Sequence, residues 1–130
     1  MKFIFDSSSI FEAILKDKVA VLVGNYTLGL ARYELGNLVW KRISLIKDIG
    51  RDDYRRLIAI VKRVVNLMEI LDINCYEADI AELAENLDLT FYDASYVLLA
   101  KSKGIPLVTE DKDVRSKARS YIKILTIEDL

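Results

Sequence analysis

Acidic residues stand at four positions where folding could bring carboxylates together, and they are Asp6, Glu34, Asp93 and Asp111. Carboxylate oxygens, without histidine or thiolate ligands, suit hard divalent cations such as Mg²⁺ or Mn²⁺. Two carboxylates about 4 Å apart repel by roughly 4 kcal/mol at an effective dielectric constant near 20. A typical domain has only about 5–15 kcal/mol of stability, so converging acids need protonation or a cation. With a bound cation, such a pocket can accept an anionic phosphate group.

The absence of histidine narrows the chemistry further. The chain has no histidine and one cysteine, Cys75. This composition excludes Ser-His and Cys-His triads, imidazole acid–base catalysis, His-bound zinc, thiolate metal clusters and an intrachain disulfide. No glycine-rich nucleotide fingerprint or Walker sequence is present. Any catalysis must come from carboxylates, hydroxyls, lysines or a bound cofactor, and the cysteine usage favours an intracellular, cytoplasmic location.

Length and composition predict one compact domain over residues 1–130. The chain is 52% hydrophobic and 30% charged, with a net charge of −1, which is typical of a globular protein. No apolar run is long enough for a membrane span, and the first residues predict a strand rather than a signal peptide. Because the net charge is near zero, binding of nucleic acid would need a local basic patch.

The elements that must position the acids alternate between strands and helices. Strands are predicted at residues 2–5, 26–28, 69–73, 105–108 and 122–125. Helices are predicted at residues 10–16, 30–49, 52–67, 76–86, 90–104 and 111–120, with residues 19–23 fitting either type. Ser9 and Glu12 fit a capping box that opens the first helix. Strands separated by helices predict a three-layer α/β/α fold with a short central parallel sheet covered on both faces.

Such a sheet places the acids at one edge. The carboxyl ends of parallel strands share an edge, and ligands bind there in open α/β sheets. Asp6 and Asp111 each follow a predicted strand, so both belong to this edge. Glu34 lies in an apolar row near the start of its helix, where a lone charge is costly to desolvate. Asp93 lies in the first turn of its helix, and helix starts lie at the same edge.

Each acid also has an explanation without chemistry. Asp6 could be a turn residue, and Asp111 could be the N-cap of the following helix. Asp93 with Thr90 resembles a capping box, and Glu34 could pair with a lysine or arginine on its own helix. The prediction of a site therefore rests on the shared edge rather than on any one position.

Sequence fragments around the acids resemble a known family. They are FDSSSI at residues 5–10, ARYELGNLVWK around Glu34, LTFYDASYVLLAKSKG around Asp93 and IPLVTEDKD around Asp111. In this order and spacing, and over nearly the whole length, they resemble a PIN-domain protein of the VapC-like toxin ribonuclease group. One departure from the family pattern is the compact segment 19–25, which predicts a short second helical region.

The resemblance implies a Mg²⁺- or Mn²⁺-dependent endoribonuclease with the PIN-like α/β/α fold. The residues that it assigns to catalysis and metal binding are Asp6, Glu34, Asp93 and Asp111. It implies that Ser8 and Thr109 support the acids by hydrogen bonding and that Asn37 lies one turn beyond Glu34. Members of the group commonly form homodimers and are silenced by a cognate antitoxin whose tail occupies the active-site groove. An RNA substrate, an antitoxin and a second copy are therefore the expected partners.

Two further expectations concern phosphate binding and rival functions. The candidates for contacting RNA phosphates are Lys41, Arg42, Lys112 and Arg115, although each also fits a solvated charged face. One rival is a non-catalytic PIN-like module that binds RNA or a protein. Another is a flavodoxin-like signalling receiver, which needs a phosphoacceptor after a middle strand and for which Asp72 is the available residue.

Overall fold

A single parallel sheet runs through the computed structural model, which describes residues 1–130. The strands are β1 (Ile4–Phe5), β2 (Tyr26–Leu28), β3 (Glu69–Leu71), β4 (Leu107–Val108) and β5 (Ile124–Leu125). All neighbours are parallel, in the order β3-β2-β1-β4-β5. The predicted α/β class with a short central parallel sheet is confirmed.

The strand at residues 26–28 has the predicted bounds, whereas the other four strands are shorter than predicted. At β4 the reason is Pro106, which has no backbone N–H to donate to a neighbouring strand. Its carbonyl still accepts a 3.0 Å hydrogen bond from the N–H of Ile4. Regular pairing therefore begins only at Leu107.

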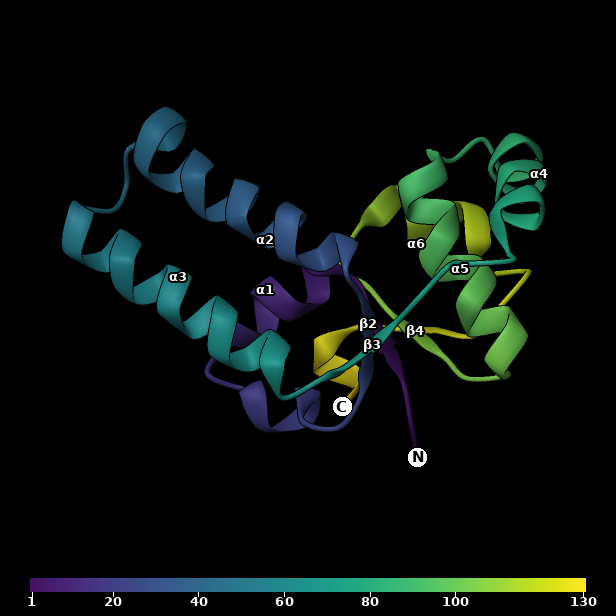
Figure 1. Cartoon of the computed structure of the whole chain (residues 1–130), viewed down its shortest axis with the longest axis horizontal. Helices are drawn as coiled ribbons and strands as arrows, with labels where there is room; N and C mark the ends of the chain where they lie inside the picture. Colours follow the sequence, from purple (N-terminus) through teal and green to yellow (C-terminus); the bar gives the residue numbers. More distant parts are fainter.

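Helices cover both faces of the sheet (Figure 1). The α-helices are α1 (Ser7–Leu15), α2 (Leu30–Lys41), α3 (Arg51–Asn66), α4 (Glu77–Leu87), α5 (Phe91–Lys103) and α6 (Lys112–Ala118). Two 3₁₀ turns lie at Val19–Leu22 and Ile127–Asp129, and a π turn lies at Arg42–Ile46. The turn at Ile127–Asp129 was not predicted, and the ambiguous segment 19–23 forms the first 3₁₀ turn. No helix is long and apolar enough to cross a membrane.

Two hydrophobic cores lie on opposite faces of the sheet, because successive strand residues point to opposite sides. In β1, Ile4 packs into the core under α4, α5 and α6, whereas Phe5 packs into the core under α1, α2 and α3. In β4, Leu107 and Val108 divide in the same way. These four side chains are fully buried, so both central strands are held from both faces.

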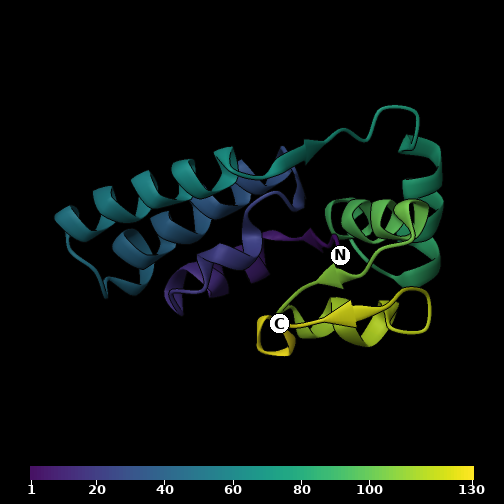
Figure 2. The ribbon, with the colours of Figure 1, turned by 90° about the horizontal axis from the view of Figure 1, so that it is seen from below.

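Helices α2 and α3 form an antiparallel hairpin that extends beyond the sheet (Figures 1 and 2). The single helix predicted over residues 30–49 is wrong in its second half. The α-helix ends at Lys41 and widens into the π turn. Lys47, in the left-handed region at φ 59°, ends this turn, and its N–H donates a hydrogen bond to the carbonyl of Arg42. The Arg42 side chain then closes the turn through a 2.8 Å ion pair with Asp48.

The predicted start of α1 is also wrong. The helix begins at Ser7, and its N-cap is Asp6, whose Oδ1 accepts a 3.0 Å hydrogen bond from the N–H of Ser9. The capping box predicted for Ser9 and Glu12 does not form, because the extended backbone of β1 passes directly into the helix at Asp6 (φ −86°, ψ 177°). The side chain of Ser9 instead donates to the carbonyl of Asp6.

The other helix boundaries follow their caps. Thr90 caps α5 by accepting from the N–H of Asp93, and Gly104 ends it with a positive φ of 65°. Asp111 caps α6. Glycine adopts that left-handed conformation without a steric penalty, so this boundary agrees with the prediction.

Candidate active site

The strand order reverses between β1 and β4 at the centre of the sheet. From β1 the chain continues to β2 on one side, and from β4 it continues to β5 on the other. Ligands bind at such a switch point in open α/β sheets, beyond the carboxyl ends of the strands. Asp6 directly follows β1, and Thr109 directly follows β4.

Asp6 has a buried and fully hydrogen-bonded carboxylate. Oδ1 accepts from Ser8 Oγ at 2.7 Å and from the N–H of Ser9 at 3.0 Å. Oδ2 accepts from Thr109 Oγ1. Burial raises the pKa of Asp6 to about 6, although these hydrogen bonds act to lower it. Its side chain is therefore fixed in orientation, and its charge is poorly compensated.

Ser8 and Thr109 connect Asp6 to the loop before α6. The N–H of Glu110 donates to Ser8 Oγ at 3.0 Å, and the N–H of Asp111 donates to Thr109 Oγ1 at 3.1 Å. The two hydroxyl oxygens are 3.2 Å apart. Each hydroxyl has one proton and donates it to Asp6, so they share no hydrogen bond. This network ties the end of β1 to the end of β4.

Glu34 projects from α2 and is half-buried. Its Oε1 accepts a 2.9 Å hydrogen bond from the hydroxyl of Tyr96. Burial raises the pKa of Glu34, the Tyr96 and Ser7 hydroxyls lower it, and the charge of Asp93 raises it again. The suggested pairing of Glu34 with a cation on its own helix is absent from the structure.

Tyr96 is a residue that the sequence reasoning missed. It lies in α5, one turn after Asp93, and it is buried. Burial raises its pKa, and the charges of Glu34 and Asp6 act in the same direction. The phenol therefore stays protonated and can only donate to Glu34. No local pattern singles Tyr96 out, because the neighbouring Ser95 also carries a hydroxyl, and Glu34, the partner of Tyr96, is 62 residues away.

Asp93 is half-buried in the first turn of α5. Its N–H donates to Thr90 Oγ1 at 3.1 Å, as the capping interpretation suggested. Burial raises the pKa of its carboxyl, and the charges of Asp111 and Asp113 raise it further. The carboxylate thus stands in the field of other acids.

Asp111 is the N-cap of α6. Its Oδ1 accepts from the N–H groups of Asp113 and Val114 at 2.9 and 3.1 Å. The capping explanation is therefore correct for this residue. It does not exclude a second role, because no hydrogen bond to Oδ2 is found.

Together the acids form a connected electrostatic group. Asp93 acts on Glu34, and Asp111 acts on Asp93, while Asp6 and Glu34 both act on Tyr96. None of the predicted acids belongs to a salt bridge; the bridged acids are Glu12, Asp48, Asp53, Asp88, Asp113 and Glu128. As the side chains stand, no set of three acids is close enough to hold a metal ion directly.

The predicted supporting and phosphate-contacting residues fall in different places. Asn37 is exposed on α2, beyond Glu34. Lys41 is exposed at the end of α2, about 10 Å along the helix from Glu34 at 1.5 Å per residue. Arg42 is engaged with Asp48.

A basic groove lies beside Asp111. It has a volume of about 430 Å³ and is lined by Lys112, Arg115, Ser116, Arg119 and Ile124. The cations recur at the spacing of one helix face, and none of them is in a salt bridge. The groove is the local basic patch that nucleic-acid binding would need, and it includes Arg119, which the sequence reasoning did not select.

Asp72 does not meet the requirement of a signalling receiver. It follows β3, which is an edge strand of the sheet. Its Oδ1 accepts from the N–H of Asn74 at 2.8 Å. The central strand ends carry Asp6 and Thr109 instead.

Comparisons with known proteins agree with this fold. A family model described as PIN domain matches residues 4–120. The curated protein "Exonuclease VapC9" of Pyrobaculum aerophilum is 32% identical over 112 residues, which are 86% of this chain and 76% of that protein. The crystal structure of PAE2754 from Pyrobaculum aerophilum has a TM-score of 0.80 and 27% sequence identity, covering 99% of this chain and 92% of that one. Since the family match spans nearly the whole sheet and both helical layers, the chain belongs to the PIN domain family.

Proposed function

We propose that the protein is a Mg²⁺- or Mn²⁺-dependent nuclease that hydrolyses RNA phosphodiester bonds. The observation that carries the proposal is the group of carboxylates from separate segments, gathered at the switch point without a lysine or arginine partner. The residues that we assign to metal binding and catalysis are Asp6, Glu34, Asp93 and Asp111. The name of the VapC relative supports a nuclease.

The donor set fits a hard divalent cation. Every candidate ligand is a carboxylate oxygen, and the pKa of Asp6, Glu34 and Asp93 is raised mainly by burial. A cation would remove that penalty. Because no set of three acids stands within direct reach of one ion, we propose that part of its coordination is completed by water.

We assign a different role in the proposed reaction to each of the acids. A divalent ion at the site would lower the pKa of water and neutralise charge developing on the scissile phosphate. Asp6 is locked by three donors and provides a ligand of fixed direction. Asp93 and Asp111 are less constrained and can adjust to the substrate. Glu34, held by Tyr96, is placed to bind the ion or to accept a proton from the attacking water.

The basic groove on α6 supports a path for the RNA backbone. Lys112 and Arg115 on α6 and its C-cap residue Arg119 line this groove, and Asp111 is the N-cap of the same helix. An RNA strand whose phosphates lie along this groove would reach the acids from one side. Lys41 and Arg42 have no such position, so we assign phosphate contact to α6.

We further propose that the protein is the toxin of a type II toxin–antitoxin pair and forms a homodimer. The kinship with a VapC protein supports the first part. Exposed apolar residues on the hairpin of α2 and α3 support a protein interface, and they include Trp40, Leu45 and Ile46, with exposed fractions of 43%, 62% and 62%. Light scattering of the purified protein tests the dimer, and neutralisation by a co-expressed neighbouring gene product tests the antitoxin.

The decisive experiment is RNA cleavage by purified variants. Wild type should cut single-stranded RNA with Mn²⁺ or Mg²⁺ and stop when EDTA is added. Asp6→Asn and Asp93→Asn should reduce the rate by at least about 100-fold, since removing one group that stabilises transition-state charge commonly costs 10²–10³. Asp52→Asn, an exposed acid on α3, is the matched control. Wild-type rates in either site variant would refute the assignment.

The mode of cutting needs its own assay, because the relative is named an exonuclease whereas the family resemblance implied an endoribonuclease. A circular RNA has no ends. Cleavage of the circle establishes internal cutting, and cleavage of the linear form alone establishes attack from an end. RNA binding without cleavage of either form would favour the non-catalytic module.

A further inference from the structure

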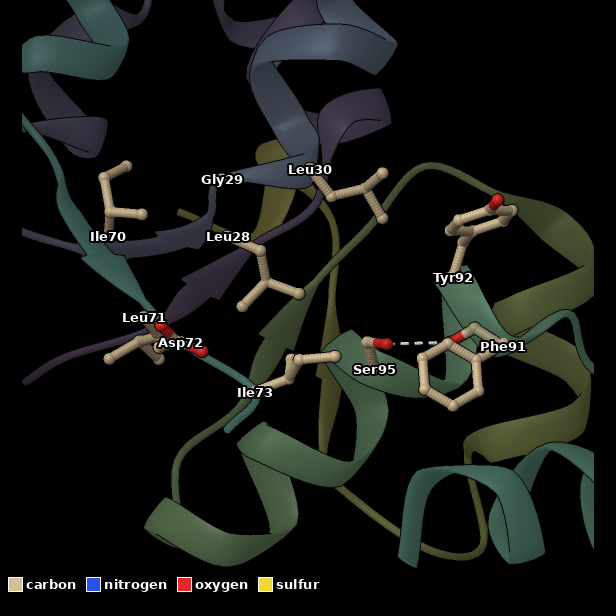
Figure 3. Close-up of a pocket in the computed structure, with 10 residues that line it drawn as sticks. All are labelled: Leu28, Gly29, Leu30, Ile70, Leu71, Asp72, Ile73, Phe91, Tyr92 and Ser95. Atoms are coloured by element: carbon tan, nitrogen blue, oxygen red, sulfur yellow. Dashed lines mark hydrogen bonds between the residues drawn. The ribbon is translucent and has the colours of Figure 1, made fainter. Parts of the chain in front are cut away.

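An apolar pocket of about 430 Å³ lies between the ends of β2 and β3, the start of α2 and the start of α5 (Figure 3). Its lining residues are Leu28, Gly29, Leu30, Ile70, Leu71, Asp72, Ile73, Phe91, Tyr92 and Ser95. The side chains come from the ends of β2 and β3, the start of α2 and the first turns of α5. No role in the chemistry proposed above involves this pocket.

The apolar pocket shares two of its walls with the acid site. Leu30 lies one helical turn before Glu34 on α2, and Tyr92 is the residue directly before Asp93 on α5. Neither acid lines the pocket, but each is within one helical turn of a residue that does. A molecule whose phosphate lies at the acids has its neighbouring groups beside this opening.

The lining selects against phosphate and in favour of a flat, uncharged ring. No lysine or arginine lines the pocket, and its single charged residue is Asp72, so an anion would be repelled. Phe91 and Tyr92 offer exposed aromatic rings, with exposed fractions of 38% and 60%. Aromatic side chains stack on nucleobases of every kind. The basic groove on α6 has the opposite character, suited to phosphates.

We propose that the apolar pocket holds one unpaired nucleobase of the RNA strand, adjacent to the phosphate at the acids. This proposal rests on the proposed ribonuclease function and names the form of its substrate. A base in a duplex is stacked and paired, so only a single strand or loop can place a base there. The protein therefore cuts unpaired RNA, with a base on one side of the acids and phosphates on the other.

Asp72 adds a preference among bases. Its Oδ1 accepts from the N–H of Asn74, which leaves Oδ2 for a ligand. A carboxylate oxygen accepts from the amino group of cytosine, adenine or guanine. Uracil has no amino group, and its only ring donor, N3–H, lies between two carbonyl oxygens that a carboxylate repels, so uracil occupies the pocket less favourably.

Gly29 allows the pocket to be filled without removing any group. A Cβ added there would meet only Ile70 Cγ2, at an ordinary 3.9 Å. The Gly29 backbone has helical angles (φ −56°, ψ −29°) that other residues adopt. Gly29→Leu therefore occupies the pocket. Gly50→Leu is the matched control, because Gly50 is also a helix N-cap with open space around it, at the far end of the hairpin.

The first test measures kcat/KM on RNA oligonucleotides in which one nucleotide at a time lacks its base. In wild type, removing the base beside the cut phosphate should lower kcat/KM by about 5- to 150-fold, the range expected for one stacked base. Gly29→Leu should slow intact RNA by a similar factor and show no further loss on the abasic RNA. Tyr92→Ala should give a partial version of the same result. Equal abasic penalties in wild type and Gly29→Leu would overturn the proposal.

The second test needs no catalysis. Uncharged nucleosides are titrated into isotope-labelled protein, and amide and methyl shifts are followed by NMR. Cytidine, adenosine and guanosine should shift Gly29 and Ile70, uridine should do so less, and Gly29→Leu but not Gly50→Leu should abolish the response. Asp72→Asn should remove the advantage over uridine. Nucleoside binding would stand even if wild type cut no RNA, which separates this proposal from the proposed function.

A third measurement tests whether the pocket binds a protein partner instead of a nucleobase. N-acetyl-leucine amide mimics an apolar side chain of a protein partner. If it shifts the same resonances while the nucleosides do not, and Gly29→Leu cleaves RNA at the wild-type rate, the pocket serves a protein and the nucleobase proposal is wrong.

Discussion

The hydroxyl of Tyr96 donates a 2.9 Å hydrogen bond to Oε1 of Glu34 and so joins α5 to α2 across the carboxyl edge of the sheet. Burial keeps the phenol protonated by raising its pKa. The bond gives Glu34 one preferred orientation while the charge of Asp93 acts on it. Tyr96 is therefore a positioning residue for Glu34.

Tyr96→Phe should impair cleavage through Glu34. The change removes one hydrogen bond to a carboxylate, worth about 1.5–3 kcal/mol, so the rate should fall about 10- to 150-fold. Because that bond lowers the pKa of Glu34, its loss raises the pKa, and the pH–rate profile should move to higher pH. Tyr33→Phe, at an exposed site on α2, is the control. An unchanged profile would contradict the positioning role.

Thr109→Val should destabilise the protein more than Thr109→Ser. The hydroxyl of Thr109 donates to Asp6 and accepts from the N–H of Asp111 at 3.1 Å, and valine can do neither. Leaving these buried groups unpaired should lower the free energy of unfolding by about 1–3 kcal/mol. Serine keeps both bonds and loses only a methyl group. Denaturant unfolding of the two variants measures the difference, and equal losses would show that the hydroxyl is unimportant.

The metal-free protein should lose stability as the pH rises from about 4 to about 6. The pKa of Asp6 is raised from 3.8 to about 6 in the folded state, so the folded protein binds this proton more tightly than the unfolded chain. The contribution is fully present below the unfolded pKa and is lost as the pH passes the folded pKa. A shift of this size corresponds to about 3 kcal/mol. The raised pKa of Glu34 and of Asp93 adds to the trend.

Asp6→Asn isolates this contribution. Other groups act in the opposite direction, for example Asp129, whose pKa is lowered mainly by hydrogen bonds from Thr126. The quantity to compare is therefore the difference in unfolding free energy between wild type and variant, measured in EDTA from pH 4 to pH 7.5. That difference should move in favour of the variant with rising pH. A constant difference would mean that Asp6 titrates normally.

Divalent cations should stabilise wild type at pH 7.5. Ligand at a hundredfold excess over Kd adds about 2.7 kcal/mol, visible as a rise in Tm with Mn²⁺. The gain should shrink below pH 6, where protons compete for Asp6. Asp6→Asn should lose most of the gain, whereas Asp52→Asn should keep it. A full gain in Asp6→Asn would place the cation elsewhere.

Much of the framework was predictable because it depends on local pattern. Alternating apolar strands and amphipathic helices predicted the parallel sheet, and Thr90 and Gly104 predicted the limits of α5. Local pattern failed to predict the start of α1, because two nearby residues can each serve as its N-cap. Both Asp6 and Ser9 can cap a helix, and the position of β1 decides in favour of Asp6.

The candidate site was predictable in part. The acids could be selected because Asp6 and Asp111 follow strand patterns and Glu34 interrupts an apolar row. Arg42 shows where prediction from sequence fails. It is near Glu34 in the sequence and was a candidate for phosphate contact, but in the folded hairpin it forms an ion pair with Asp48. Tyr96 could not be selected, because its partner is 62 residues away.

The sequence by itself determined the kinds of chemistry open to this protein, since its residue types exclude imidazole ligands and thiolate metal clusters. It also determined the sheet edge at which the acids lie, because strand and helix periodicity is local. Only the tertiary structure decided which donors hold each acid, that Tyr96 bonds Glu34, and that the chain forms an apolar pocket and a basic groove. Hydrogen-bond partners and pKa values depend on contacts and burial between distant segments, and these exist only once the chain has folded.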